Sequence, residues 1–338
     1  MKVYEVQKDA TDLDGLVRTE RPIPTPGPFE VLIRVRATSL NYRDYLVVTG
    51  RYFTPLDRPT IPLSDGSGEV VSVGSAVSRF QPRDRVAGTF FQVWKDGALS
   101  SPPPALGVPL DGTLAEYIAL HEDGVVTVPK HLSFEQAATL PCAGVTAWNA
   151  LMASGRSVKP GETVLCLGTG GVSMLAMQFA KAAGARVIVT SSNDEKLERA
   201  LSYGATHTIN YRRFPDWDNQ VAALTEGRGV DHIIEIGGVG TLARSYRSIG
   251  FAGKIALIGF LAAPDGDEGA NPFPLMPKGA SLQGIGVGST RMFEDMNRAI
   301  QIHGIAPIVD RVYDFDHAPD AFRRLASREF VGKIVVTV

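Results

Sequence analysis

The sequence predicts an α/β protein in which a doubly wound parallel sheet is combined with a β-rich domain. A glycine-rich loop lies between an apolar run and a helical stretch, and strand-like and helical segments alternate after it. The segments on either side of this region are strand-like instead. We therefore expect a β-rich domain at 1–125, onto which the tail 304–338 folds back, and a doubly wound domain at 126–303.

Strand signals dominate the first of these segments. Apolar residues alternate along 31–36, and the run at 69–73 lies between two glycines. A further short strand is expected at 85–87. The prolines Pro102–Pro104 require a loop, because proline donates no ladder hydrogen bond. Gly112–Tyr117 is then expected to begin another strand.

A helical pattern at 133–154 opens the alternating region. The strands expected after it are Val164–Leu167, Arg186–Thr190, Val230–Glu235, Lys254–Ile258 and Ser281–Gly288. The helices expected between them are Met174–Ala183, Asp194–Tyr203, one that begins at Thr241, and Met292–His303. The tail returns to strand-like sequence at Ile308–Val312 and Gly332–Val338.

The loop Gly168-Thr169-Gly170-Gly171-Val172-Ser173 carries the first chemical signal. Glycines permit a tight turn there and let backbone N–H groups approach a pyrophosphate at the helix N-terminus, where the helix dipole favours anions. Ser173 replaces the third glycine of the G-x-G-x-x-G pattern, but the loop lies between strand and helix as the mechanism requires. The alternative interpretation is an ordinary strand–helix turn without a ligand.

The residues after the second strand indicate which nucleotide is bound. An NAD site places Asp or Glu here to bind the ribose hydroxyls, whereas this chain has Ser191 and Ser192, with Lys196 one turn into the next helix. Hydroxyls and an ammonium favour a ribose phosphate, so the sequence predicts NADPH rather than NADH. A structural role is also open: Ser192 or Asn193 could cap the helix at 194–203, with Lys196 merely solvated.

Composition excludes several classes of partner. The 338 residues are 44% hydrophobic and 21% charged, with a formal net charge of −2, which gives no reason to expect nucleic acid or an anionic membrane as partner. No apolar stretch approaches the roughly 20 residues of a transmembrane helix, and the sequence begins in a strand-like segment without a signal peptide. With only Cys142 and Cys166 we expect no disulfide framework and a cytoplasmic protein.

Segments spread along the whole chain carry a resemblance to a known family. They are Ser39–Asp44, Pro62–Gly68, Gly112–Tyr117, Leu140–Trp148 and the nucleotide loop. With these segments the chain resembles the medium-chain dehydrogenase/reductase superfamily, in particular its zinc-free quinone oxidoreductase-like branch. The resemblance implies a GroES-like catalytic domain, a Rossmann domain, and a homodimer formed through the Rossmann sheet edge, for which Ser281–Gly288 is the candidate strand.

The resemblance also places Tyr211 near the adenosine phosphate. Together with the loop and the strand ends it yields one set of expected cofactor-binding residues. They are Thr146, Gly168, Thr169, Gly170, Gly171, Val172, Ser191, Ser192, Lys196, Tyr211, Gly237 and Ile258.

Zinc alcohol dehydrogenases of the same superfamily hold a catalytic zinc with Cys, His and Cys beside a Glu. At these positions the present chain has Asn41, Ser64 and Cys142, with Asp65 in place of the Glu. One thiolate cannot supply the three or four N/S ligands of tetrahedral zinc, so we expect no metal, and a buried hydrophobic role for Cys142. No cysteine occurs between 92 and 111, and the six histidines are scattered singly.

Without zinc, hydrogen-bond donors must polarise the substrate. The expected catalytic residues are Asn41, Tyr42 and Tyr52, the last of which matches the Gly-x-Tyr of quinone reductases. The alternative is that Tyr42 packs in the β-domain and Asp44 caps a turn. Asp65 is expected either to orient Asn41 or Arg43, or to pair with a surface arginine.

These observations predict an NADPH-dependent oxidoreductase that transfers hydride to a quinone or an α,β-unsaturated carbonyl without zinc. Two alternatives stay open. One is a zinc-independent alcohol/aldehyde oxidoreductase, and the other is a non-catalytic NADPH-binding protein.

Overall fold

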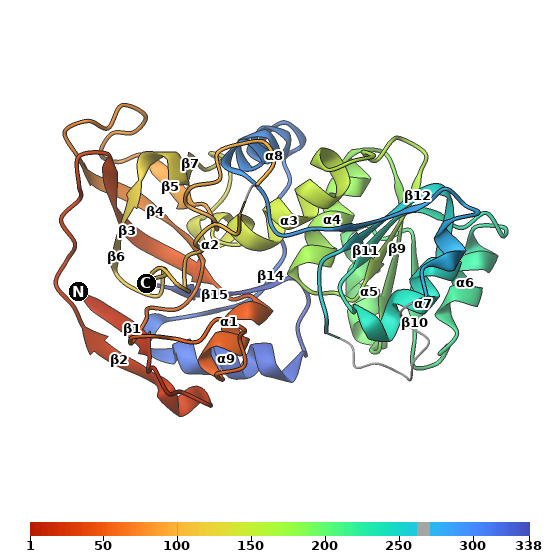
Figure 1. Cartoon of the computed structure of the whole chain (residues 1–338), viewed down its shortest axis with the longest axis horizontal. Helices are drawn as coiled ribbons and strands as arrows, with labels where there is room; N and C mark the ends of the chain where they lie inside the picture. Colours follow the sequence, from red (N-terminus) through yellow and green to blue (C-terminus); the bar gives the residue numbers. More distant parts are fainter. Residues whose placement is uncertain (100, 262–270) are drawn as a thin grey trace. The chain divides into compact units, whose positions relative to one another are not determined.

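The computed structural model describes residues 1–99, 101–261 and 271–338. The chain divides into two compact units, each with its own sheet (Figure 1). Unit 1 comprises Met1–Val145 and Gly288–Val338, and unit 2 comprises Thr146–Val287.

Unit 1 is built on a seven-stranded sheet with the strand order β14-β15-β3-β4-β5-β7, and β6 pairs with β3. A separate antiparallel pair is formed by β1 and β2, and isolated bridges link its Val3 to Ala115 and its Val6 to Thr60. The strands are β1 (Lys2–Val6), β2 (Leu16–Glu20), β3 (Glu30–Ser39), β4 (Asp65–Val73), β5 (Arg85–Gly88), β6 (Tyr117–His121), β7 (Val125–Thr127), β14 (Val309–Tyr313) and β15 (Lys333–Thr337).

The tail supplies the two strands at one side of this sheet, β14 at its edge and β15 next to β3. β15 pairs antiparallel with the end of β3, with Val335 opposite Ser39, and parallel with β14 on its other side. The apolar run Ile334–Val336 is fully buried, as expected for a strand covered on both faces. β3 therefore lies between β4 and β15, two strands that come from opposite ends of the sequence.

The helices of unit 1 include two that the sequence patterns did not reveal. They are α1 (Tyr42–Val48) and α9 (Ala318–Ser327), alongside α2 (Phe134–Ala137), a π-helical segment Leu140–Gly144 and α8 (Thr290–His303). Both unforeseen helices are short, and their stability comes from burial: Val48 and Phe322 belong to one core cluster with Ile334 of β15.

Unit 2 is a six-stranded parallel sheet with the order β10-β9-β8-β11-β12-β13, the order of doubly wound dinucleotide folds. Its strands are β8 (Thr163–Leu167), β9 (Arg186–Ser191), β10 (His207–Asn210), β11 (Val230–Glu235), β12 (Ile249–Leu257) and β13 (Ser281–Gly284). Its helices are α4 (Gly171–Ala182), α5 (Asp194–Tyr203), α6 (Trp217–Leu224) and α7 (Val239–Ser248), and α3 (Val145–Trp148) begins at the unit boundary.

The fold class is confirmed, since a doubly wound parallel sheet accompanies a β-rich unit. The structural division follows Val145 and precedes Gly288, whereas the sequence patterns placed it at 125 and 303. The physical reason is packing: α2 contacts β3 and β4, and α8 contacts β7, so both helices join the β-rich unit.

Two expected strands are shorter than predicted. Gly112–Glu116 is not a strand, because its backbone bonds to the loop at 61–63 and β6 begins only at Tyr117. The strand expected at Ser281–Gly288 ends at Gly284.

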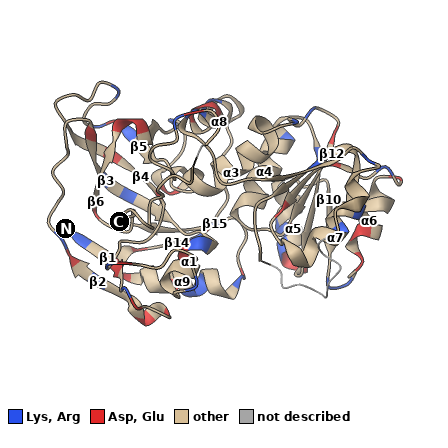
Figure 2. Ribbon diagram, viewed as in Figure 1, with Lys and Arg blue, Asp and Glu red and all other residues tan. Residues whose placement is uncertain are grey.

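No helix among the described residues is long and apolar enough to cross a membrane. Basic and acidic residues both occur along the ribbons of each unit, as in α8 (Figure 2).

Candidate functional site

Most of the expected cofactor residues lie at one edge of the unit 2 sheet. Gly168 follows β8, Ser191 ends β9, and Tyr211 follows β10. Gly237 comes after β11 and Ile258 directly after β12. Because all these strands are parallel, their carboxyl ends share the edge at which doubly wound sheets bind ligands.

The loop between β8 and α4 leaves the first turn of α4 open. Gly168 has a φ of +72°, and a Cβ built at Gly170 would meet open space. The N-cap residue of α4 is Gly170, which has no side chain. The first N–H groups of the helix, from Gly171 and Val172 onward, are therefore not capped by a side chain. Such a helix N-terminus fits a pyrophosphate.

Ser173 occupies the third glycine position of the loop pattern. Its side chain is buried, and its hydroxyl donates a hydrogen bond to the carbonyl oxygen of Leu167 at 2.6 Å. The third glycine of the pattern serves close packing of helix against strand. A small side chain whose polar atom is satisfied meets the same requirement. Thr169 of the same loop is also buried.

Asn193 caps α5, because its Oδ1 accepts the N–H of Lys196 at 3.0 Å. This resolves the choice between Ser192 and Asn193 as capping residue, and the Ser192 hydroxyl takes no part in the cap. The N–H of Tyr211 donates to the carbonyl oxygen of Ser191 at 3.0 Å, so Tyr211 lies beside the end of β9. Ser191 and Ser192 therefore lie close to Tyr211 and to the first turn of α5.

Glu235 is a site residue that sequence reasoning missed. At the end of β11 its buried carboxylate accepts the N–H groups of Gly237 (2.8 Å) and Gly238 (3.0 Å) and the hydroxyls of Thr241 and Ser245. Burial raises the pKa of Glu235 above its usual range, although these hydrogen bonds oppose the change. The sequence signal that could have revealed Glu235 is a charged residue at the end of an apolar strand. Glu235 fixes the loop that contains Gly237.

For two expected cofactor residues, Thr146 and Ile258, the structure gives less evidence of a place in the cofactor site. Thr146 is buried in α3, away from the strand ends in sequence. Ile258 is partly exposed, and its N–H donates to the carbonyl oxygen of Glu235 at 2.8 Å.

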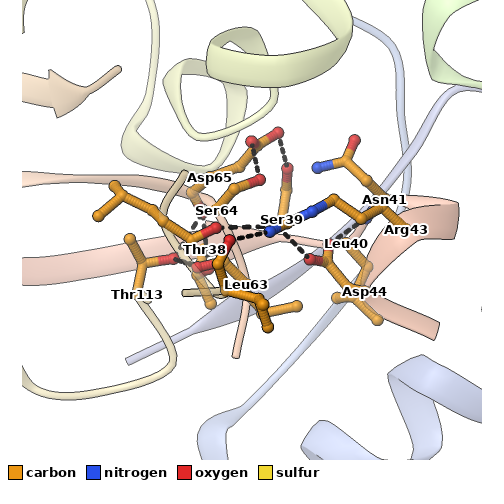
Figure 3. Close-up of polar contacts among 12 residues, drawn as sticks. Thr38, Ser39, Leu40, Asn41, Arg43, Asp44, Leu63, Ser64, Asp65 and Thr113 are labelled. Carbon is orange, nitrogen blue, oxygen red and sulfur yellow. Dashed lines mark hydrogen bonds and ion pairs between the residues drawn. The ribbon is translucent and has the colours of Figure 1, made fainter. Parts of the chain in front are cut away.

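In unit 1, polar residues converge where β3 ends. Ser39 pairs with Asp65 across β3–β4 and with Val335 across β3–β15. The Asp65 carboxylate is fully buried and accepts hydrogen bonds from the hydroxyls of Ser39 (3.3 Å) and Ser64 (2.8 Å), as Figure 3 shows. The ammonium nitrogen of Lys333, the first residue of β15, lies 3.4 Å from Asp65 Oδ2. Neither alternative expected for Asp65 occurs, since its charged partner is this buried lysine.

Asn41 joins the same cluster. Lys333 Nζ donates to Asn41 Oδ1 at 2.6 Å, whereas Asn41 Nδ2 is buried and has no hydrogen-bond partner among the described residues. The backbone N–H of Asn41 donates to Asp44 Oδ2 at 2.7 Å, so Asp44 caps the turn that begins α1. Burial raises the pKa of Asp44 to about 6, and the nearby Asp65 charge adds to the effect while Arg43 opposes it.

Tyr42 and Tyr52 flank the two ends of α1 and pack against arginines. The ring centroid of Tyr42 lies 6.2 Å from that of Tyr45, and the Arg328 guanidinium lies 5.9 Å from the Tyr42 ring. The Arg43 guanidinium lies 5.0 Å from the Tyr52 ring. Of the three expected catalytic residues, the structure brings only Asn41 into contact with the Lys333–Asp65 pair.

Cys142 lies in the π-helical segment and is partly exposed rather than fully buried. The dense surroundings of its thiol and the charge of Asp65 raise the pKa of Cys142 above its usual range. The thiol is therefore neutral at pH 7.

Comparisons with known proteins match both units. Residues 27–130 match the family of alcohol dehydrogenase GroES-like domains, and residues 171–302 match the zinc-binding dehydrogenase family. The "zinc-type alcohol dehydrogenase-like protein C1773.06c" of Schizosaccharomyces pombe is 43% identical over 99% of both chains. The chain belongs to the zinc-type alcohol dehydrogenase-like proteins of the medium-chain dehydrogenase/reductase superfamily.

Two further similarities show which members of the medium-chain dehydrogenase/reductase superfamily this chain resembles more. A crystal structure of a candidate alcohol dehydrogenase from Sinorhizobium meliloti 1021 has 41% identity and a TM-score of 0.93, and covers 100% of this chain and 98% of its own. The quinone oxidoreductase of Sus scrofa is 30% identical over 95% of this chain and 92% of its own. The superfamily assignment is thus confirmed, but the relatives with greater identity carry alcohol dehydrogenase names rather than the quinone oxidoreductase name.

The side chains of this medium-chain dehydrogenase/reductase do not fit a catalytic zinc. No group of three His, Cys, Asp or Glu side chains in the described part of the chain could hold a metal ion. Asn41, at the position of one zinc ligand of the relatives, and Asp65, at the position of the neighbouring Glu, instead contact the ammonium of Lys333. A divalent cation placed among them would face that positive charge at short range.

Lys333 was missed in the sequence because it stands in a tail that shows only strand character. The signal was a charged residue directly before the apolar run Ile334–Val336, at the start of a strand buried on both faces.

Proposed function

We propose that this protein is an NADP(H)-dependent oxidoreductase that interconverts an alcohol and an aldehyde or ketone without zinc. The observation that carries the proposal is the buried, unpartnered Nδ2 of Asn41, a hydrogen-bond donor held beside a buried ammonium. A buried donor without a partner costs free energy, about 1–3 kcal/mol, which a bound oxygen atom repays. A carbonyl or alcohol oxygen is the acceptor of that kind in the substrates of this superfamily.

The comparisons support an alcohol or a simple carbonyl compound as the substrate. Besides the Schizosaccharomyces pombe relative, an alcohol dehydrogenase of Geobacillus stearothermophilus is 30% identical over 91% of this chain. In unit 2 the open N-terminus of α4 supports a dinucleotide, whose nicotinamide supplies or accepts the hydride when bound. In unit 1 the amide of Asn41 donates to the substrate oxygen as negative charge develops on it.

The preference for NADP(H) over NAD(H) rests on the end of β9. Residues 190–193 contain no acid, and Asn193 is committed to the cap of α5. Ser191, Ser192, Lys196 and the adjacent Tyr211 supply hydroxyls and one ammonium for a ribose phosphate.

Independence from zinc rests on the donor set. Of the three residues at the ligand positions of zinc relatives, Asn41, Ser64 and Cys142, only Cys142 is a common zinc ligand, and one thiolate cannot hold a tetrahedral zinc. The ammonium of Lys333 supplies a cation at the same place.

A quinone or α,β-unsaturated carbonyl is the second candidate substrate. A neutral amide polarises an oxygen less than zinc does, and conjugated acceptors need the least polarisation because charge spreads over the conjugated system. The similarity to the quinone oxidoreductase of Sus scrofa supports this candidate as well.

A screen of NADPH oxidation over aldehydes, ketones, quinones and enones, with and without a chelator, tests these proposals. Chelator-resistant turnover of aldehydes or ketones supports the first function, and turnover confined to quinones or enones supports the second. Tight NADPH binding without turnover of any acceptor would indicate a non-catalytic NADPH-binding protein. Turnover that a chelator abolishes would contradict both enzymatic proposals.

A further inference from the structure

Lys333 is a buried lysine whose ammonium is fully satisfied inside unit 1. The residue is 3% exposed, and Nζ donates to the carbonyl oxygen of Leu40 (2.7 Å), to Asn41 Oδ1 (2.6 Å) and to Asp65 Oδ2 (3.4 Å). An ammonium has three N–H donors, and here three oxygens accept them. None is left for a substrate, so any effect of Lys333 on a reaction must pass through another residue.

The sheet itself sets this geometry. The N–H of Leu40 donates to the carbonyl oxygen of Ile334 at 3.1 Å, which ties the start of β15 to the residue before Asn41. On the other side of β3, Asp65 begins β4 opposite Ser39. Three neighbouring strands therefore deliver an amide, a carboxylate and an ammonium to one point.

The bond from Lys333 determines which way the Asn41 amide points. A carboxamide carries its oxygen and its NH₂ group on opposite sides of one carbon. An ammonium can only donate, so it selects Oδ1 and directs Nδ2 away from itself. Nδ2 is the atom that is buried and unpartnered in the described structure. A purely structural Lys333–Asp65 ion pair would not require this unsatisfied donor.

We propose that Lys333 is the positioning residue of the substrate site, which fixes the Asn41 carboxamide so that Nδ2 donates to the substrate oxygen. This inference rests on the proposed function, since it assumes that an oxygen-bearing substrate binds at Asn41. Asp65 balances the charge of Lys333 and is held in turn by the hydroxyls of Ser39 and Ser64. No proton moves from Lys333 in this arrangement.

The first test needs no turnover. In protein labelled with ¹⁵N-asparagine, the Asn41 side-chain resonances are assigned by their loss in Asn41→Ala. We expect Lys333→Met to shift or broaden them strongly, because the amide is then free to flip. Lys254→Met is the matched control, because Lys254 is a buried lysine of unit 2 whose ammonium donates to the Ser154 carbonyl oxygen. Unchanged Asn41 resonances in Lys333→Met overturn the proposal.

Lys333→Met leaves the Asp65 carboxylate buried without its cation, and the variant could fail to fold for that reason alone. The double variant Lys333→Met/Asp65→Asn removes both charges and keeps the volume. It is measured in the same way, and the same change in the Asn41 resonances is expected of it.

The second test is a double-mutant cycle on kcat/KM with the best acceptor of the wild type. We expect Asn41→Ala to lose about 10²-fold, the effect of removing one oxyanion donor, and Lys333→Met to lose at least about 10-fold. The combined variant should be no slower than Asn41→Ala, because Lys333 acts through Asn41. Losses that multiply overturn the proposal. If the wild type reduces no acceptor, the proposed function fails, and the resonance test still decides the role of Lys333.

Discussion

The hydroxyl of Ser173 donates to the carbonyl oxygen of Leu167 at 2.6 Å, which links the last residue of β8 to the first turn of α4. The bond is buried and crosses the base of the nucleotide loop. A loop pattern that lacks its third glycine is thus compatible with the strand–helix packing that a dinucleotide site needs.

Ser173→Ala should therefore lower the free energy of unfolding by about 1 kcal/mol, because the Leu167 oxygen loses its partner inside the protein. Urea denaturation measures this loss. Ser202→Ala is the control, since the Ser202 hydroxyl makes a comparable bond to the Arg199 oxygen on the surface. We expect that variant to stay within about 0.5 kcal/mol of the wild type. Equal losses in the two variants would contradict the buried role of Ser173.

Lys196→Ala should weaken NADPH binding by roughly 1–3 kcal/mol and leave NADH binding nearly unchanged, because only NADPH carries a 2′-phosphate on its adenosine ribose. Fluorescence titration of both cofactors measures the difference. Lys159→Ala is the control: this exposed lysine precedes β8, at the opposite end of the parallel strands. Equal losses for the two cofactors in Lys196→Ala would refute the phosphate-binding role.

The purified protein should contain well under one zinc per chain, and its activity should resist a chelator, because the Lys333 ammonium contacts Asn41, at one ligand position, and Asp65, at the position of the neighbouring Glu. Elemental analysis of protein prepared without chelator checks the metal content. Stoichiometric zinc that is required for activity would overturn the zinc-free proposal.

Asp44→Asn should change how stability depends on pH. Burial raises the pKa of Asp44 from 3.8 to about 6, so between these values the folded protein holds a proton that the unfolded chain has lost. This residue therefore lowers stability as the pH rises from about 4 to 6, by roughly 2–3 kcal/mol in total. Asparagine retains the bond to the Asn41 N–H and removes the charge.

The free energy of unfolding of Asp44→Asn, relative to the wild type, should accordingly increase between pH 4.5 and pH 7. Denaturation series at several pH values measure it, and the contributions of titrating groups that do not interact with Asp44 cancel in the difference. A constant difference across this range would show that Asp44 ionises normally in the folded protein.

We propose that the protein is a homodimer formed through β13. Within the described residues β13 pairs only with β12, so its outer edge is available, and Leu282 on it is 37% exposed. Leu282→Asp should shift the protein to monomer in sedimentation experiments at micromolar concentration. Leu201→Asp, on the exposed surface of α5, should not. A wild type that is already monomeric under these conditions would rule out the proposal.

The nucleotide unit was largely predictable because its signals are local. The glycine loop between an apolar strand and a helix places its own residues, and α5 was predicted with the bounds that the structure shows, Asp194–Tyr203. Parallel strands then bring Ser191 and Tyr211 to one edge without further information. Glu235 escaped because its role depends on backbone N–H groups, which no side-chain pattern displays.

The substrate site was less predictable because its residues meet only through non-local strand pairing. Asn41 could be singled out by its position in a family motif, but Lys333 lies 292 residues away in sequence. Its role follows from the register of β15 against β3, which the alternation of apolar residues does not determine. The helix α1 was missed for a related reason, since its seven residues show too short a pattern and are stabilised by tertiary burial.

The place of β15 between β14 and β3 also has a consequence for biosynthesis. The ribosome completes residues 146–287 before it makes 333–337, yet the sheet of unit 1 closes only when β15 pairs with residues 37–39. The nucleotide unit therefore has its whole sequence available while residues 37–39 at the end of β3 still lack a partner strand on one edge. We expect nascent chains that stop before Lys333 to present that edge, and to be the form of this protein that most needs a chaperone.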